Sequence, residues 1–131
     1  MRPLLPGPLV SFYGDDYTGS SAVMEVLTFA GLPTVLFLDV PTPERLARFE
    51  GYRGIGIAGV ARSRGRKWMD KHLPPVFRAL AELKAPVSHY KVCSTLDSSP
   101  QVGSIGRAAE LAAPILGGAG HPLVIAAPAI A

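Results

Sequence analysis

The chain has 131 residues, enough for one ordinary domain with its own core. Hydrophobic residues make up 48% and charged residues 18%, which excludes a disordered tail or linker. The formal net charge of +3 permits an anionic ligand but gives no strong indication of nucleic acid. No apolar run approaches the roughly 20 residues of a membrane span. With no secretory pattern and one cysteine, Cys93, we expect a cytoplasmic protein without a membrane partner.

Strand and helix patterns alternate along the chain. Five apolar runs are predicted strands, at residues 9–13, 34–38, 54–60, 87–92 and 123–127. Helical spacing separates them, at residues 20–30, 42–49, 68–83 and 105–116. Pro74 and Pro75 fall inside the third of these segments, so a short helix, a break and a second helix over 76–83 are predicted there.

This alternation predicts an α/β fold, a Rossmann-like open parallel sheet flanked by helices on both faces. The chain stops at Ala131, just after the fifth predicted strand, with no closing helix. We therefore expect residues 1–131 to be one domain of a longer protein. In open parallel sheets, ligands bind beyond the carboxyl ends of the strands. The polar loops that follow the strands are accordingly the candidate sites, and they are expected to meet at one edge.

Two adjacent carboxylates, Asp15 and Asp16, stand between the first strand and its helix. Both could be turn and N-cap residues. Alternatively, one could cap the helix while the other faces the cleft and accepts a hydroxyl proton or holds a metal. This turn contains neither a Walker A loop nor a Gly-x-Gly-x-x-Gly pattern, so the usual phosphate cradles are missing from it.

The loop after the third strand is basic. It spans residues 62–67 and carries Arg62, Arg64, Arg66 and Lys67 without an acidic residue. Arg62 lies nearest to the strand end, where a guanidinium could hold a carboxylate through two hydrogen bonds. We expect Arg64 and the residues after it to face solvent.

The loop after the fourth strand combines a cation with hydroxyls. Lys91 ends the strand, and Ser94 and Thr95 follow it. A lysine beside hydroxyls and a helix N-terminus suits an anion, although an ordinary capped loop with an extended lysine has the same pattern. The three histidines are isolated in the sequence, so no metal site is expected.

Two of these segments resemble a known family. Tyr13-Gly14-Asp15-Asp16-Tyr17-Thr18-Gly19 resembles the Asp-Asp-x-Thr-Gly signature of the four-carbon acid sugar kinases. The segment from Tyr90 to Pro100, with Gly103 to Ala108, is similar to the second signature of one branch. The resemblance covers nearly the whole chain and corresponds to the N-terminal, sugar-binding domain of those kinases.

The resemblance implies roles for particular residues. Asp15, Asp16, Thr18 and Gly19 would line the substrate end of the cleft. Arg62 and Lys91 would bind the carboxylate of the sugar acid, and Ser94 and Thr95 its hydroxyls. ATP and Mg²⁺ would be bound mainly by a separate C-terminal domain that this sequence lacks.

The chain departs from the family pattern at two places. Ala61 stands where many members have Ser, and Asp97-Ser98-Ser99 where many have Arg-Gly-Asn. These departures leave the identity of the sugar acid open.

The leading hypothesis is therefore the substrate-binding part of an ATP-dependent kinase that phosphorylates a threonate-like or erythronate-like acid or a 3-oxo relative. Asp16 is the expected base, with Asp15 as the second choice. The alternatives are a stand-alone sugar-acid-binding module or an inactive remnant. A nucleic-acid-binding domain is disfavoured, because the basic residues cluster in one loop without flanking aromatic pairs. A homodimer is left open.

Overall fold

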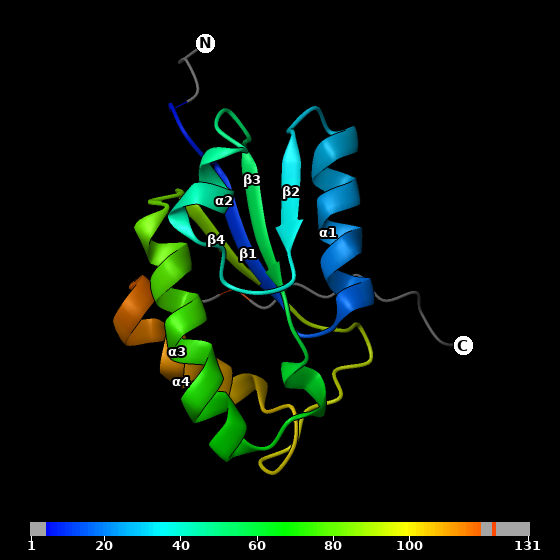
Figure 1. Ribbon diagram of the computed structural model, residues 1–131. Coiled ribbons are helices and arrows are strands. Elements are labelled where there is room, and N and C mark those ends of the chain that lie inside the picture. Colours follow the sequence, from blue (N-terminus) through cyan, green and yellow to red (C-terminus); the bar gives the residue numbers. More distant parts are fainter. Residues whose placement is uncertain (1–4, 119–121, 123–131) are drawn as a thin grey trace, which may run out of the picture.

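A four-stranded parallel sheet in the order β2-β3-β1-β4 forms the centre of the computed structural model, which describes residues 5–118 and Pro122 (Figure 1). Its strands are β1 (Val10–Gly14), β2 (Thr34–Phe37), β3 (Gly54–Ala58) and β4 (Val87–Lys91). The predicted α/β class and parallel sheet are confirmed. The strand predicted at residues 123–127 lies outside the described residues.

The register of the sheet aligns the ends of three strands. Gly14, the last residue of β1, pairs with Ala58 of β3 on one side and with Lys91 of β4 on the other. Since all pairings are parallel, the segments that follow these three strands leave the sheet at the same edge. The order of the strands also has a switch point at β1: β2 and β3 lie on one side of it, and the chain then passes over β1 to place β4 on the other side.

Helices cover both faces of the sheet, as predicted. α1 (Tyr17–Phe29) packs on one face; α2 (Pro43–Ala47) and α3 (Arg66–Glu82) pack on the other. α4 (Ile105–Leu116) packs against α3, away from the sheet (Figure 1). Gly14 and Ser20 allow β1 and α1 to approach closely, since a Cβ added to Gly14 would stand only 1.9 Å from the Oγ of Ser20.

Capping residues set where the helices begin. α1 starts at Tyr17, three residues earlier than predicted, because the Asp16 side chain accepts a hydrogen bond from a backbone N–H of the first turn. α4 has the predicted bounds, and Ser104 caps it by accepting from the backbone N–H of Arg107 at 3.1 Å. α2 is capped by Thr42 but ends at Ala47, two residues short of the prediction.

The predicted break at Pro74 and Pro75 is wrong. α3 is a continuous helix of 17 residues that contains both prolines. An interior proline costs about 3 kcal/mol, but burial of a large apolar side chain returns about 1.5–3 kcal/mol. Four such side chains recur at helical spacing and are 0–2% exposed: Met69, Leu73, Phe77 and Leu80.

The predicted basic loop is also mostly helical. Ala61–Ser63 forms a short 3-10 helix, η1, and α3 already begins at Arg66. Only Arg64 and Gly65 separate the two helices, so Arg62, Arg66 and Lys67 lie on helical turns. Within the part of the chain that the structure describes, no helix is long and apolar enough to cross a bilayer.

The aromatic core under β1 yields a first prediction. Phe77 is 1% exposed, and its ring meets those of Tyr13 and Tyr90 at centroid distances of 6.5 and 6.2 Å. We expect Phe77→Ala to lower the free energy of unfolding by about 3–5 kcal/mol because it leaves a cavity. Phe29→Ala is the control, because Phe29 is 84% exposed and should change stability by less than about 0.5 kcal/mol. Urea unfolding measures both, and equal losses would contradict this description of the core.

Candidate functional site

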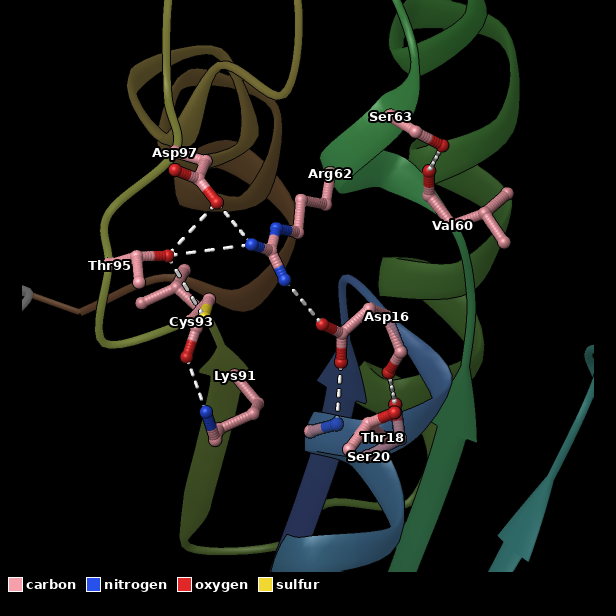
Figure 2. Close-up of polar contacts among 12 residues, drawn as sticks. Asp16, Thr18, Ser20, Val60, Arg62, Ser63, Lys91, Cys93, Thr95 and Asp97 are labelled. Atoms are coloured by element: carbon pink, nitrogen blue, oxygen red, sulfur yellow. Dashed lines mark hydrogen bonds and ion pairs between the residues drawn. The ribbon is translucent and has the colours of Figure 1, made fainter.

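The polar segments that follow β1, β3 and β4 meet at one edge of the sheet, as the sequence predicts. Backbone hydrogen bonds continue the strand pairing into them: the N–H of Asp15 donates to Lys91 O, and the N–H of Arg62 to Asp15 O, each at 3.1 Å. Figure 2 shows the result, with Arg62 lying between Asp16 and Asp97 and Lys91 close by. Asp16, Arg62 and Lys91 are thus brought together.

Asp16 has two structural partners. Its Oδ1 accepts the backbone N–H of Gly19 at 2.5 Å, which is the N-cap bond of α1. Its Oδ2 accepts from Nη1 of Arg62 at 2.9 Å. The Asp16 carbonyl also accepts from the hydroxyl of Ser20. Both oxygens of this half-exposed carboxylate are therefore engaged, one by the helix terminus and one by the guanidinium.

Asp15 lies in a different environment. It is only 4% exposed, and burial raises the pKa of its carboxyl to about 6. The neighbouring charge of Asp16 raises this pKa further, while Arg62 and Lys91 lower it. Asp15 therefore changes protonation near neutral pH, which is the range that suits a proton acceptor in catalysis.

Two tyrosine rings, those of Tyr13 and Tyr90, lie near Asp15. The rings of Tyr13 and Tyr90 lie 5.5 Å apart between centroids, and burial raises the pKa of the Tyr13 hydroxyl to about 12. That hydroxyl is buried without a hydrogen-bond partner among the described residues, and it lies against Gly59, where an added Cβ would be 2.0 Å away. Beside the larger effect of burial, the charge of Asp15 raises the pKa of each tyrosine hydroxyl, because both rings lie near its carboxyl.

Arg62 is shared by two carboxylates. Beside its bond to Asp16, its Nη2 donates to Oδ2 of Asp97 and lies 3.4 Å from Oγ1 of Thr95. Thr95 Oγ1 is in turn 2.9 Å from Asp97 Oδ2. The hydrogen bonds that Arg62 donates to Asp97 and Asp16 raise the pKa of the guanidinium. The hydrogen bonds that Asp97 accepts from Arg62 and Thr95 lower the pKa of its carboxyl.

Lys91 is the second cation of the site. Its ammonium donates to the backbone carbonyl of Val92, and among the described residues no carboxylate forms an ion pair with it. A Cβ added to Gly19 would stand 3.5 Å from Nζ of Lys91, so the ammonium lies beside the first turn of α1. Lys91 therefore presents positive charge next to a helix N-terminus, an arrangement that favours an anion.

The other predicted residues lie around this cluster. Gly19 contributes its backbone N–H to Asp16, and Thr18 lines a hollow of about 420 Å³ with Tyr17, Ser21, Leu36 and Leu38. Thr95 contacts Arg62, whereas Ser94 is exposed and its hydroxyl makes no hydrogen bond within the described part of the chain. Arg64 is exposed, with its guanidinium carbon 5.8 Å from the centre of the Trp68 ring, as expected of a residue outside the site.

Sequence reasoning missed Asp97 and Tyr13 as members of the site. Asp97 was visible only as a departure from a family pattern, although its position two residues after Thr95 allows a local hydroxyl–carboxylate contact. Gly103 holds this loop in place. It has φ +61°, and a Cβ there would stand 2.4 Å from the backbone oxygen of Arg62 and 3.2 Å from that of Asp97.

A parallel α/β sheet with a charged cluster at its carboxyl edge defines a domain for a small polar ligand. The model of the family described as sugar-binding N-terminal domain matches residues 10–131, and the chain belongs to this family. It is 54% identical over 122 residues to a 3-oxo-isoapionate kinase of Paraburkholderia graminis. The matched region is 93% of this chain but 26% of that relative, so the chain spans about a quarter of its length.

These matches confirm the resemblance to the N-terminal domain of the four-carbon acid sugar kinases. No solved structure matches the chain.

The buried carboxyl of Asp15 yields a second prediction. Its folded-state pKa of about 6 lies above the ordinary value of 3.8, so the folded protein binds this proton more tightly than the unfolded chain. The ionised carboxylate therefore costs stability above about pH 6, and the cost disappears as the pH falls towards 4. We expect Asp15→Asn to raise the free energy of unfolding on the order of 1 kcal/mol at pH 8 and to give no gain at pH 4.

Asp39→Asn is the matched control for this experiment. The Asp39 side chain is 68% exposed and pairs with Arg45 at 2.7 Å, so its amide should bring no gain at either pH. Thermal unfolding at the two pH values compares both variants with the wild type. A gain for Asp15→Asn that does not depend on pH would exclude the titration of Asp15 as its cause.

Proposed function

We propose that this chain is the substrate-binding domain of a longer, ATP-dependent kinase that phosphorylates a sugar acid, either a threonate-like or erythronate-like acid or a 3-oxo relative such as 3-oxo-isoapionate. The observation that carries the proposal is the gathering of two cations, Arg62 and Lys91, near a buried carboxyl, Asp15, at the carboxyl edge of the sheet; both cations lower the pKa of that carboxyl. Membership of a sugar-binding family and 54% identity to a 3-oxo-isoapionate kinase support it.

In this proposal the two cations select an acid. A carboxylate needs fixed positive donors, and Arg62 and Lys91 supply them at the ends of β3 and β4. The hydroxyls of the ligand face the polar groups of the adjoining segments, namely Thr18, the backbone of Gly19, Ser94 and Thr95. Charge at one end of the ligand and hydroxyls along it would then fix which hydroxyl lies near the carboxylates.

The contacts favour Asp15 over Asp16 as the base. The sequence-based choice of Asp16 stays a prediction, but its two carboxylate oxygens already accept hydrogen bonds from the backbone N–H of Gly19 and from Arg62. Asp15 has a pKa of about 6 and can hold and release a proton near neutral pH. We therefore propose that Asp15 accepts the proton of the acceptor hydroxyl while Asp16 fixes the turn and orients Arg62.

The described residues do not fit a nucleotide site. In residues 5–118 no three His, Cys, Asp or Glu side chains are grouped as metal ligands, and no Walker A loop follows β1. ATP and Mg²⁺ are accordingly assigned to the rest of the longer protein. The contribution of this domain to phosphoryl transfer is the position of the acceptor hydroxyl and the removal of its proton.

The proposed function is tested with the full-length protein, ATP and three acids: 3-oxo-isoapionate, threonate and erythronate. We expect ADP release that depends on one of these acids, measured in a coupled assay. Asp15→Asn should lower kcat by about 10²–10⁴, the usual contribution of a general base, while Asp16→Asn should lower it less. Absence of turnover with all three acids would overturn the proposed substrate class, and full activity of Asp15→Asn would remove Asp15 as the base.

Acid recognition yields a further prediction. Charge-assisted hydrogen bonds contribute roughly 1.5–3 kcal/mol each, so Arg62→Ala should weaken binding of the acid by about 10- to 100-fold. Arg62→Lys should not restore it, because an ammonium cannot form the paired hydrogen bonds of a guanidinium. Arg64→Ala, an exposed arginine two residues away, should bind like the wild type. Calorimetric titration of the full-length protein measures all three, and a loss confined to Arg64→Ala would show that the wrong arginine is assigned.

A further inference from the structure

Both terminal nitrogens of the Arg62 guanidinium already donate to carboxylates in this structure. Nη1 donates to Asp16, and Nη2 donates to Asp97 with Thr95 alongside (Figure 2). A carboxylate that is to be held by both terminal nitrogens must therefore replace one of these two partners. The question is which of the two aspartates is held less firmly.

Asp16 is the firmly held partner. It has a second anchor, since its other oxygen accepts the N–H of Gly19 at 2.5 Å, and the positive end of the α1 dipole lies at the same place. Its side chain is 28% exposed. Moving it would break the N-cap of a 13-residue helix as well as the ion pair.

Asp97 is the weakly held partner. Its side chain is 56% exposed, and it lies between β4 and α4 in a stretch without regular secondary structure. Apart from Arg62, the one hydrogen-bond partner of its side chain among the described residues is the Thr95 hydroxyl, two residues away in the same loop. Rotation of Asp97 away from Arg62 breaks their ion pair but no helix N-cap.

The charge balance of the site also favours displacement of a carboxylate from Arg62. Arg62 and Lys91 face three carboxyl groups, those of Asp15, Asp16 and Asp97, and Asp15 titrates near neutral pH. An additional carboxylate entering this cluster would bring an unbalanced negative charge. If it exchanges with Asp97, the charge beside Arg62 is unchanged.

We propose that Asp97 is a specificity-determining residue that occupies, in the empty site, the place on Arg62 that the carboxylate of the sugar acid takes on binding. This proposal rests on the proposed function, because it requires that a sugar acid binds to Arg62. A ligand without a carboxylate cannot replace the contact between Asp97 and Arg62, so it gains nothing from displacing the loop.

The test compares wild type and Asp97→Asn in the full-length protein by calorimetric titration. The probes are 3-oxo-isoapionate, threonate and erythronate, and the methyl ester of whichever acid binds most tightly. We expect Asp97→Asn to bind that acid two- to fivefold more tightly, since an exposed ion pair that competes with the ligand is worth a few tenths to 1 kcal/mol. The ester, which has the same hydroxyls but no charge, should bind both proteins equally.

The matched control is Asp70→Asn. Asp70 also pairs with an arginine, Arg107, at 2.6 Å, but on the α3–α4 surface, so this variant removes the same charge elsewhere. It should bind the acid like the wild type. If it tightens binding as much as Asp97→Asn does, the net charge and not the displaced contact is responsible, and the proposal fails.

The remaining outcomes distinguish failure of the inference about Asp97 from failure of the proposed function. Unchanged or weaker acid binding by Asp97→Asn, with wild-type binding intact, would mean that Asp97 stays on Arg62 in the complex, and it would overturn the inference alone. If Asp97→Asn tightened the binding of the acid and of its ester equally, the effect would not depend on the carboxylate of the ligand. That result would also overturn the inference. Failure of the wild type to bind any of the three acids would overturn the proposed function itself.

Discussion

The parallel pairing of β1 with both β3 and β4 is the constraint on which the site depends. Gly14 is in register with Ala58 and with Lys91, so three strands end at one level. Two further backbone bonds, from Asp15 to Lys91 and from Arg62 to Asp15, carry this alignment into the polar segments beyond the sheet. Arg62 follows Asp16 by 46 residues in the sequence, and Lys91 follows it by 75. The alignment of the strands nevertheless brings the three charged side chains together, and no long loop is needed.

The adjacent aspartates show how one turn supports opposite demands. The extended residue Asp16 turns its carboxylate to the N-terminus of α1 and to Arg62, both of which donate hydrogen bonds to it. Asp15 is directed into a buried environment above Tyr13 and Tyr90, where ionisation is costly. The first arrangement stabilises the start of α1, whereas the second lowers stability above about pH 6 and keeps an ionisable carboxyl in a buried place. Because successive side chains of an extended backbone point to opposite sides, the carboxylates of Asp15 and Asp16 reach these two environments although the residues are adjacent.

Sequence patterns predicted the class of fold and the edge at which the polar segments meet. They did so because apolar strand runs and helix-capping residues are local features of the sequence. Thr42 and Ser104, for example, precede helices that begin where the sequence predicts them. The patterns failed for α3, where the local preference of Pro74 and Pro75 is outweighed by burial against the sheet, a property of the packed domain.

Side-chain roles in the site were equally out of reach of local reasoning. Neither the orientation of Asp15 and Asp16 nor the contact of Asp97 with Arg62 has a signature in spacing, because each depends on a partner from another strand or loop.

The tight contact between Gly14 and Ser20 has a consequence for how this scaffold can change its ligand. With no room even for a methyl group there, the turn from β1 into α1 is a fixed template that any altered version of the domain must keep. The segment from Ser94 to Gln101 contains no glycine and lies outside the helices and strands, whereas Gly103, just after it, passes over Arg62 and Ser104 caps α4. Libraries that aim to redirect this domain to acids of other sizes should therefore diversify that segment and leave the turn untouched, so that new preferences arise without rebuilding the support beneath them.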